Sequence, residues 1–399
     1  MLKFSERIIN MQNSPIRRLA PLAAQAKKNG KKVYHLNIGQ PDIETPDFFF
    51  EAVKEFDSKI LKYVDSQGIP ELVNSFIKYY KSFDINFDKE DIIITNGGSE
   101  AVLFAIYGAA NHGDSILVPE PFYANYNALS SIAGVNIVSF LTKAEDGFHL
   151  PSKEVIKKSI SETTKAILLS NPGNPTGVVY TREEVNLIAQ VAKEHDLFII
   201  ADEAYREFIY DSLSYTSFMH IPEINDRVIL IDSVSKRYSA CGARVGIIAS
   251  KNKELMALML KMAESRLSVA TLEQVGAAAL INTPKEYLDE VNKEYEARRD
   301  VVYDALKSIP GVICQKPSGA FYIFAKLPVK NSEDFVRFLL TDFHIDNETV
   351  MLAPAEGFYR TPGLGRNEIR ISYCLKSDDL KKAMNILSKG LEAFIHQKK

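Results

Sequence analysis

The chain has 399 residues, 46% of them hydrophobic and 25% charged, which is the composition of an ordinary globular protein with room for two domains. Its formal net charge of −3 gives no electrostatic reason to expect nucleic acid as a partner. Three widely spaced cysteines and the lack of a long uncharged apolar run argue against a disulfide framework, a metal site and a membrane span, and they predict a soluble cytoplasmic protein.

The first segment of the chain, residues 1–45, contains three prolines and lacks the alternating pattern of a strand. We expect it to pack on a smaller domain or on a partner subunit.

Short apolar runs alternate with helical patterns from about residue 91 to residue 250. The strand candidates are 92–95, 115–118, 136–141, 166–170, 197–201, 228–231 and 245–249. Thr181 and Glu184 have the spacing of a capping box, which predicts a helix between the fourth and fifth strands. The pattern predicts an α/β large domain, residues 46–285, whose mainly parallel seven-stranded sheet lies between helices.

The pattern changes after about residue 285. A long charged helix over 285–306 leads to a hairpin-like stretch at 319–324, and two more helices follow, the last from about residue 377. This predicts a smaller α+β domain over residues 286–399.

Polar motifs follow several of the predicted strands, at the edge where ligands bind in open α/β sheets. The first motif, Gly97-Gly-Ser-Glu, opens a helix and suits a phosphate, although a tight turn with a serine N-cap is the alternative. The second, Asn171-Pro-Gly-Asn-Pro-Thr-Gly, is either a stiff turn alone or a turn that offers the amide of Asn174 to a ligand oxygen.

Asp202 ends the fifth predicted strand, where a buried carboxylate needs a cation or a hydrogen-bond donor. A protonated pyridine nitrogen would be such a partner, and Tyr205 would reach the same ligand. The alternatives are a helix N-cap at Asp202 and a core position for Tyr205.

The run from Ser233 to Arg244 follows the sixth strand. Lysine amines such as that of Lys236 form Schiff bases with pyridoxal phosphate, and Ser233, Ser235 and Arg244 suit its dianionic phosphate. The alternative is a solvated lysine beside an arginine in a surface ion pair.

These motifs, in this order and followed by Arg370-Ile-Ser, resemble the class I and II aminotransferases of pyridoxal-phosphate fold type I, and most closely their aspartate and aromatic branch. The resemblance spans about residues 15 to 395. It implies that Lys236 is the aldimine lysine and the general base, and that Asp202 pairs with the pyridine nitrogen. Tyr205 and Asn174 would hydrogen-bond the ring oxygen.

The resemblance also implies a role for each remaining motif residue. The phosphate would be held by Gly98, Ser99, Ser233, Ser235 and Arg244. Tyr123 would stack on the ring, with Phe122 as the alternative if the register differs by one. Arg370 would bind the substrate α-carboxylate beside the Gly39 backbone, and Tyr63 would cross a homodimer interface to the neighbouring phosphate.

The activity implied is transamination of an L-amino acid with a 2-oxo acid, 2-oxoglutarate being the expected acceptor and an aspartate or aromatic amino acid a candidate donor. A pyridoxal-phosphate lyase that cleaves a β-substituent and a non-catalytic sensor are the alternatives. Cys241-Gly-Ala departs from the family pattern, and Arg266 is a candidate second anion contact. Arg17, Arg18 and Arg266 are candidates for binding a second substrate carboxylate, but the sequence does not distinguish them from surface charges.

Overall fold

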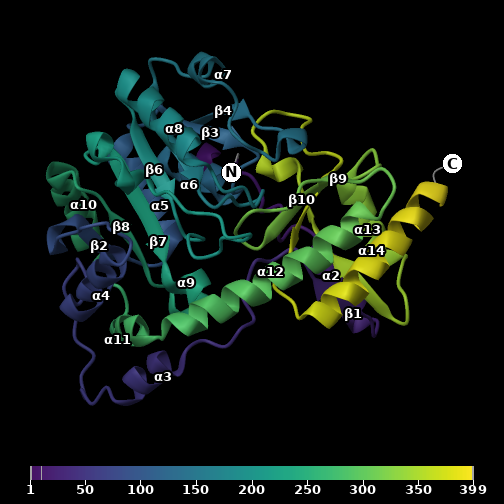
Figure 1. Ribbon diagram of the computed structural model, residues 1–399, viewed down its shortest axis with the longest axis horizontal. Helices are drawn as coiled ribbons and strands as arrows, with labels where there is room; N and C mark the ends of the chain where they lie inside the picture. Colours follow the sequence, from purple (N-terminus) through teal and green to yellow (C-terminus); the bar gives the residue numbers. More distant parts are fainter. Residues whose placement is uncertain (1, 10, 398–399) are drawn as a thin grey trace.

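A seven-stranded sheet forms the centre of the larger domain in the computed structural model, which describes residues 2–9 and 11–397 (Figure 1). Its strands are β2 (Ile92–Thr95), β3 (Ser115–Glu120), β4 (Asn136–Leu141), β5 (Thr164–Ser170), β6 (Phe198–Asp202), β7 (Val228–Ser233) and β8 (Gly246–Ala249). They lie in the order β2-β8-β7-β6-β5-β3-β4, and β8 alone runs antiparallel to its neighbours. The predicted mainly parallel sheet is therefore confirmed.

Helices cover both faces of this sheet. They are α4 (Pro70–Lys81), α5 (Gly98–Ala109), α6 (Asn125–Ala133), α7 (Lys153–Lys158), α8 (Arg182–Glu194), α9 (Val234–Arg237), α10 (Lys253–Arg266) and α11 (Thr271–Ala279). Successive strand residues point to opposite faces, so Ile116 and Val118 join one core with α5, α6 and α10, while Leu117 joins the other with α4, α8 and α11. The predicted capping box begins α8: the Glu184 amide donates to the Thr181 hydroxyl, and the Thr181 amide donates to the Glu184 carboxylate.

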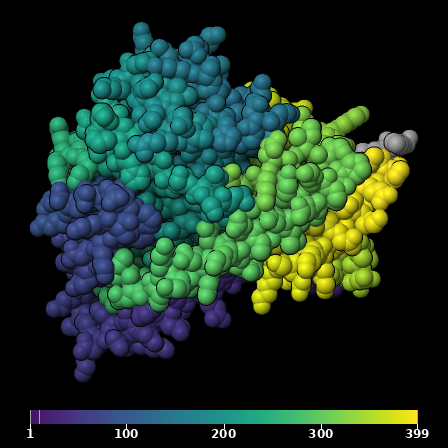
Figure 2. Space-filling model, viewed as in Figure 1, coloured from purple at the N-terminus to yellow at the C-terminus, as the bar shows by residue number. Residues whose placement is uncertain are grey.

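A smaller domain contains a four-stranded antiparallel sheet in the order β12-β13-β10-β9. Its elements are β9 (Ile313–Cys314), β10 (Tyr322–Lys326), α13 (Ser332–Thr341), β12 (Ala353–Pro354), β13 (Glu368–Ser372) and α14 (Ser377–Gln397). The long helix α12 (Lys285–Lys307) runs from α11 to this domain, and Figure 2 shows it as a continuous ridge on one face of the molecule. The predicted α/β fold with an appended α+β domain is confirmed.

The N-terminal segment contributes α1 (Glu6–Ile9), α2 (Ala20–Lys28), β1 (Lys32–His35) and then α3 (Asp47–Lys54). The segment contains a strand that its sequence pattern did not indicate, since β1 pairs in parallel with β11 (Glu348–Met351). The two middle residues of β1 are buried and its ends are not, so the strand lacks the alternating pattern that would mark it in the sequence. Leu19, Ala23 and Ala26 of this segment join the core of the smaller domain.

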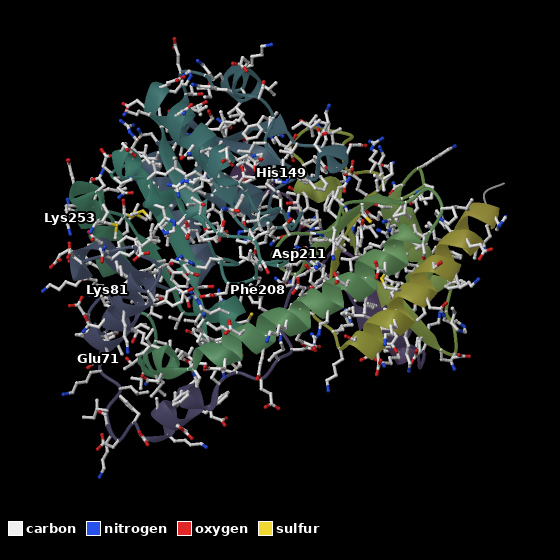
Figure 3. All side chains as sticks on the ribbon, in the orientation of Figure 1. Glu71, Lys81, His149, Phe208, Asp211 and Lys253 are labelled. Carbon is white, nitrogen blue, oxygen red and sulfur yellow. The ribbon has the colours of Figure 1, made fainter. Side chains whose placement is uncertain are left out.

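The two domains meet beside α12, where Figure 3 labels Phe208 and Asp211. Asp211 accepts hydrogen bonds of 2.7 and 3.0 Å from Arg299 of α12, and the Phe208 ring lies 5.5 Å from that of Tyr295. The segment that follows β6 is thus fixed to the smaller domain. Over residues 2–9 and 11–397, no helix combines the length and the apolar character needed to cross a membrane.

Candidate active site

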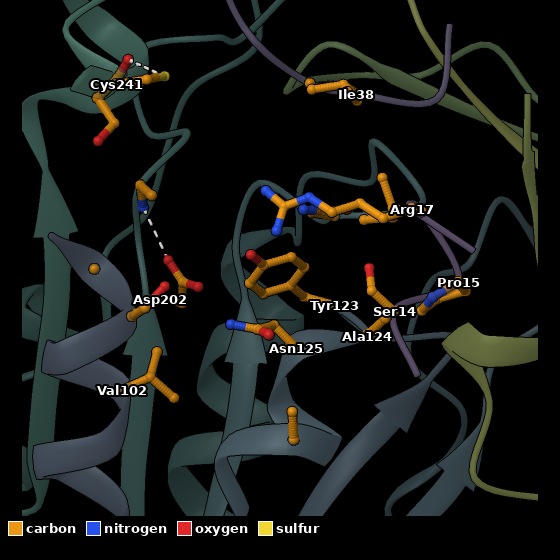
Figure 4. Close-up of a pocket in the computed structure, with 18 of the residues that line it drawn as sticks. Ser14, Pro15, Arg17, Ile38, Val102, Tyr123, Ala124, Asn125, Asp202 and Cys241 are labelled. Atoms are coloured by element: carbon orange, nitrogen blue, oxygen red, sulfur yellow. Dashed lines mark hydrogen bonds between the residues drawn. The ribbon is translucent and has the colours of Figure 1, made fainter. Parts of the chain in front are cut away.

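A cavity of about 510 Å³ lies at the carboxyl ends of the central strands, with walls from the N-terminal segment, the sheet and the smaller domain (Figure 4). The predicted site residues that line it are Gly39, Gly98, Ser99, Tyr123, Asn174, Asp202, Tyr205, Ser233, Ser235, Lys236, Arg244 and Arg370. Tyr63 is the predicted site residue that does not, and its side chain is exposed.

The parallel strands explain why motifs far apart in sequence meet at this cavity. In the sheet register Ser170 of β5 lies opposite Asp202 of β6, and Asp202 lies opposite Ile231 of β7. The segments that follow these strands therefore begin at one edge. They carry Asn174, Asp202 and the run from Ser233 to Lys236 into the same cavity.

Lys236 projects from the one-turn helix α9 toward the N-terminal segment. Its Nζ atom donates to the Gly39 carbonyl at 3.0 Å and lies 3.7 Å from Cys241 Sγ. A Cβ atom at Gly39 would stand 1.8 Å from the hydroxyl oxygen of Tyr322, so only glycine lets the backbone of the N-terminal segment lie this close to Tyr322. The amine is thus held within the cavity, where a ligand aldehyde would meet it.

One end of the cavity has the donors that a phosphate requires. Helix α5 begins there, and its N-cap is Gly97 with φ 75°, so Ser99 lies inside the helix rather than capping it. The Arg244 guanidinium lies over Gly97, where a Cβ atom would come within 2.4 Å of Nη2. Free amide groups at the start of a helix and a planar guanidinium both favour a dianion, and the hydroxyls of Ser233 and Ser235 lie in the same wall.

Asp202 lies in the middle of the cavity wall with 8% of its surface exposed. Burial raises the pKa of its carboxyl, while hydrogen bonds from the Tyr126 hydroxyl at 2.8 Å and the Ala204 amide at 3.3 Å oppose the rise. Among the described residues no ion pair neutralises it. A cationic ligand group would therefore stabilise the ionised form. The sequence does not single out Tyr126, which lies three residues beyond Tyr123 in α6.

Arg370 of β13 forms the opposite end of the cavity. It is 1% exposed, and it donates to Asn174 Oδ1 at 2.9 Å and to the Asn37 carbonyl at 2.7 Å. Its Nε atom has no hydrogen-bond partner within the described part of the chain. A buried guanidinium with an unused donor suits a carboxylate.

Tyr322 supports this end and was not predicted as a site residue. Its ring lies 4.4 Å from the Arg370 guanidinium, and its hydroxyl is 2.8 Å from that of Tyr205. Asn174 Nδ2 lies 3.5 Å from the same Tyr205 oxygen, so the amide and the two phenols form one chain. The signal in the sequence was the Gly319-Ala-Phe-Tyr run, which we assigned only to a hairpin.

Tyr123 and Arg17 form a further wall. Tyr123 lines the cavity, whereas Phe122 is buried in the hydrophobic core and stacks on Tyr126, so it does not take the alternative register. Figure 4 shows Arg17 of the N-terminal segment beside Tyr123. The Arg17 side chain has no hydrogen bond or ion pair with any residue that the structure describes.

Two other candidate cations lie outside the cavity. Arg266 donates to the carbonyls of Ile94 and Leu267 and lies 3.4 Å from Glu100, so in this chain its guanidinium does not face a ligand. Arg18 forms an ion pair with Glu333. The structure therefore separates Arg17 from the other two arginines that the sequence could not distinguish.

The groups in this cavity match pyridoxal phosphate part by part. The phosphate requires the α5 amides, the serine hydroxyls and Arg244; the aldehyde requires the Lys236 amine; and the ring nitrogen requires Asp202. The fit is tested by Asp202, whose buried carboxyl has a raised pKa and no ion-pair partner among the described residues. A protonated ring nitrogen would supply the cation that this carboxyl lacks.

Comparison with known proteins agrees with this geometry. The model of the family "Aminotransferase class I and II" matches residues 31–387. The chain is 30% identical to the aspartate aminotransferase of Bacillus subtilis (strain 168), over 98% of this chain and 99% of the relative.

Solved structures agree as well. An alanine aminotransferase from Pyrococcus furiosus has a TM-score of 0.88 at 30% identity, and an aspartate aminotransferase from Thermotoga maritima has 0.89 at 28%. In both cases 98% of this chain and 100% of the other are covered. The chain belongs to the class I and II aminotransferases, which are pyridoxal-phosphate-dependent enzymes of fold type I.

Proposed function

We propose that this aminotransferase binds pyridoxal 5′-phosphate through Lys236 and transfers the amino group of a dicarboxylic L-amino acid, with 2-oxoglutarate as the acceptor. One observation carries the substrate assignment: the cavity is lined by three arginines, Arg17, Arg244 and Arg370. The cofactor phosphate takes one and the substrate α-carboxylate takes the second. The third, Arg17, has no partner of its own and suits a second carboxylate.

The bound cofactor supplies an aldehyde that captures amino groups and a ring that accepts electron density. The residues of the chain divide the remaining work. Asp202 would hold a proton on the ring nitrogen, and Tyr205 and Asn174 would hydrogen-bond the ring oxygen. Tyr123 would cover one face of the ring.

Lys236 moves the proton that transamination requires. With the cofactor bound, the free Nζ atom of Lys236 would act as a base that takes the proton from the substrate α-carbon and delivers it to the cofactor carbon that receives the amino group. Arg370 and the Gly39 backbone orient the substrate carboxylate, which fixes the α-carbon relative to this amine. The relatives include both aspartate and alanine aminotransferases, so their names do not identify the amino donor of this enzyme. Our assignment of a dicarboxylic donor therefore depends on Arg17.

We further propose that the enzyme is a homodimer in which Tyr63 of each subunit reaches the neighbouring phosphate. The support is a stretch of exposed apolar side chains, with Ile60 66%, Leu61 63% and Tyr63 82% exposed. A stretch of this kind is suited to burial against another protein surface.

The experiment that tests the proposed function uses the purified protein with pyridoxal 5′-phosphate and a panel of amino donors. With 2-oxoglutarate as the acceptor, we expect keto-acid formation to be fastest from aspartate and its analogues. The matched control is Lys236→Ala, which should lower turnover by at least about 10⁴-fold while some cofactor stays bound. Pyruvate and ammonia formed without an acceptor would contradict the proposal and favour a lyase.

A further inference from the structure

A buried charged cluster lies behind α9, on the side away from the cavity. Arg237 donates to the Asp232 carboxylate, and the Tyr80 hydroxyl donates to the same carboxylate oxygen at 2.6 Å. The Arg237 guanidinium also stacks 4.0 Å from the ring of Tyr79 and lies 3.9 Å from Glu207. Neither Arg237 nor Asp232 lines the cavity, so the roles assigned above use neither of them.

The cluster is joined directly to the residues that would hold the cofactor. Lys236 and Arg237 are consecutive, and the first lines the cavity while the second is 2% exposed within the cluster. Likewise Asp232 is followed by Ser233, and the Ser233 amide donates to Asp232 Oδ1 at 2.7 Å. Asp232 therefore contacts both ends of the segment that runs from Ser233 to Arg237.

This segment cannot hold its own shape. Helix α9 contains four residues, and a single helical turn is unstable in isolation because nucleation costs more than one hydrogen bond returns. Its position must come from outside contacts. The polar ones include the contacts of Arg237 with Asp232 and with Glu207, and the hydrogen bond from the Val234 amide to the Val245 carbonyl.

Stability alone is a weak reason for such a pair. Burial opposes the charge of Arg237, although Asp232 and the surrounding tyrosines raise the pKa of the guanidinium well above its usual value. Replacing a buried ion pair with apolar side chains is often neutral or stabilising, whereas a charged pair fixes one geometry. An ion pair that fixes the backbone next to Lys236 would also fix the position of the Lys236 amine.

We propose that the Arg237–Asp232 ion pair positions the Lys236 amine for bond formation with the cofactor aldehyde, which makes Arg237 a positioning residue; this rests on the proposed function. In that step the amine nitrogen bonds to the aldehyde carbon, and the carbonyl oxygen leaves as water with two protons from the amine. A misplaced amine slows this step. The phosphate contacts from α5 and Arg244 do not depend on α9, whereas those from Ser233 and Ser235 belong to the same segment as Lys236.

The test is the rate at which the apoprotein captures pyridoxal 5′-phosphate, read by borohydride reduction and the mass of the labelled Lys236 peptide. Arg237→Met should slow labelling by about 10- to 100-fold, because a displacement near 1 Å has this effect on a bond-forming step. Affinity for pyridoxamine 5′-phosphate, which has no aldehyde, should fall by a smaller factor than the labelling rate, because α5 and Arg244 hold its phosphate apart from α9. Arg237→Lys should recover part of the labelling rate, and Asp232→Asn should slow it as Arg237→Met does.

Arg299→Met is the matched control, because Arg299 is also buried and ion-paired but lies in α12, away from the cavity. It should unfold more easily than wild type yet label Lys236 at the wild-type rate. Equal loss of pyridoxamine phosphate and pyridoxal phosphate binding in Arg237→Met, or unchanged labelling, would overturn the positioning role. If Arg237→Met does not fold, a wild-type labelling rate in both Arg237→Lys and Asp232→Asn overturns it instead. A wild-type protein that does not label at Lys236 would refute the proposed function itself.

Discussion

The two ends of the cavity are built in different ways. At the sheet end, several interacting groups are neighbours in sequence: the Ser235 amide lies 3.4 Å from the Ser233 hydroxyl, and Lys236 contacts Cys241 five residues away, although its amine also donates to the Gly39 carbonyl. At the small-domain end, Arg370 binds the carbonyl of Asn37 across 333 residues and the amide of Asn174 across 196. Local motifs form the first end, and tertiary packing assembles the second.

This difference corresponds to the two binding functions of the proposed reaction, namely cofactor binding and substrate binding. The cofactor is the same for every aminotransferase of the family, and the sheet end would hold it with short motifs that follow neighbouring strands of one sheet. The substrate differs, and its carboxylates would meet Arg17 and Arg370, which come from separate segments. A substitution at one end should therefore change one of two measurements, cofactor affinity or substrate selection, and leave the other.

Of the variants that should change substrate turnover but not cofactor affinity, Arg370→Gln is expected to have the largest effect. The variant removes the buried guanidinium that would bind the α-carboxylate, and losing one partner of a buried charge pair costs about 3 kcal/mol, or about 10²-fold in kcat/KM for every donor. Pyridoxal phosphate affinity should stay within about twofold of wild type. Steady-state kinetics and a cofactor titration measure the two quantities, and a parallel fall in both would show that the ends are not independent.

A smaller and more selective effect is expected from Arg17→Gln. Loss of a charge-assisted contact to a second carboxylate costs about 1.5 kcal/mol, which raises KM for aspartate and 2-oxoglutarate about tenfold. KM for alanine should not change, because alanine has no second carboxylate. Arg18→Gln is the matched control, since the neighbouring arginine pairs with Glu333 outside the cavity. Equal effects on aspartate and alanine would rule out the dicarboxylate assignment.

The contrast between local motifs and tertiary packing also explains which features the sequence could predict. Strand ends such as that of β6 were identified because a buried apolar run followed by Asp202 is a local signal. Strand β1 was missed because its partner β11 lies over 300 residues away and only packing reveals it. Tyr322 was missed for the same reason, since its strand pairs with the strand of Arg370. The direction of β8 in the sheet also depends on its neighbours, not on its composition.

The smallest effect concerns Asp202 in the apoprotein. Because burial raises its pKa in the folded state, the unfolded chain loses this proton first as pH rises, and the carboxyl lowers the free energy of unfolding at neutral pH. Asp202→Asn should therefore unfold at higher denaturant concentration than wild type at pH 7. The difference should shrink as the pH falls and vanish below about 4, where the carboxyl is protonated in both states.

Asp226→Asn is the control for this comparison, because the Asp226 side chain is exposed. It should show no pH-dependent difference from wild type of this kind. Adding pyridoxal phosphate should reverse the order of Asp202→Asn and wild type at pH 7, since the ring nitrogen supplies the cation that Asp202 lacks. If the cofactor stabilised both proteins equally, Asp202 would not be the partner of that nitrogen, and the cofactor would be held at the sheet end by its phosphate and by Lys236 alone.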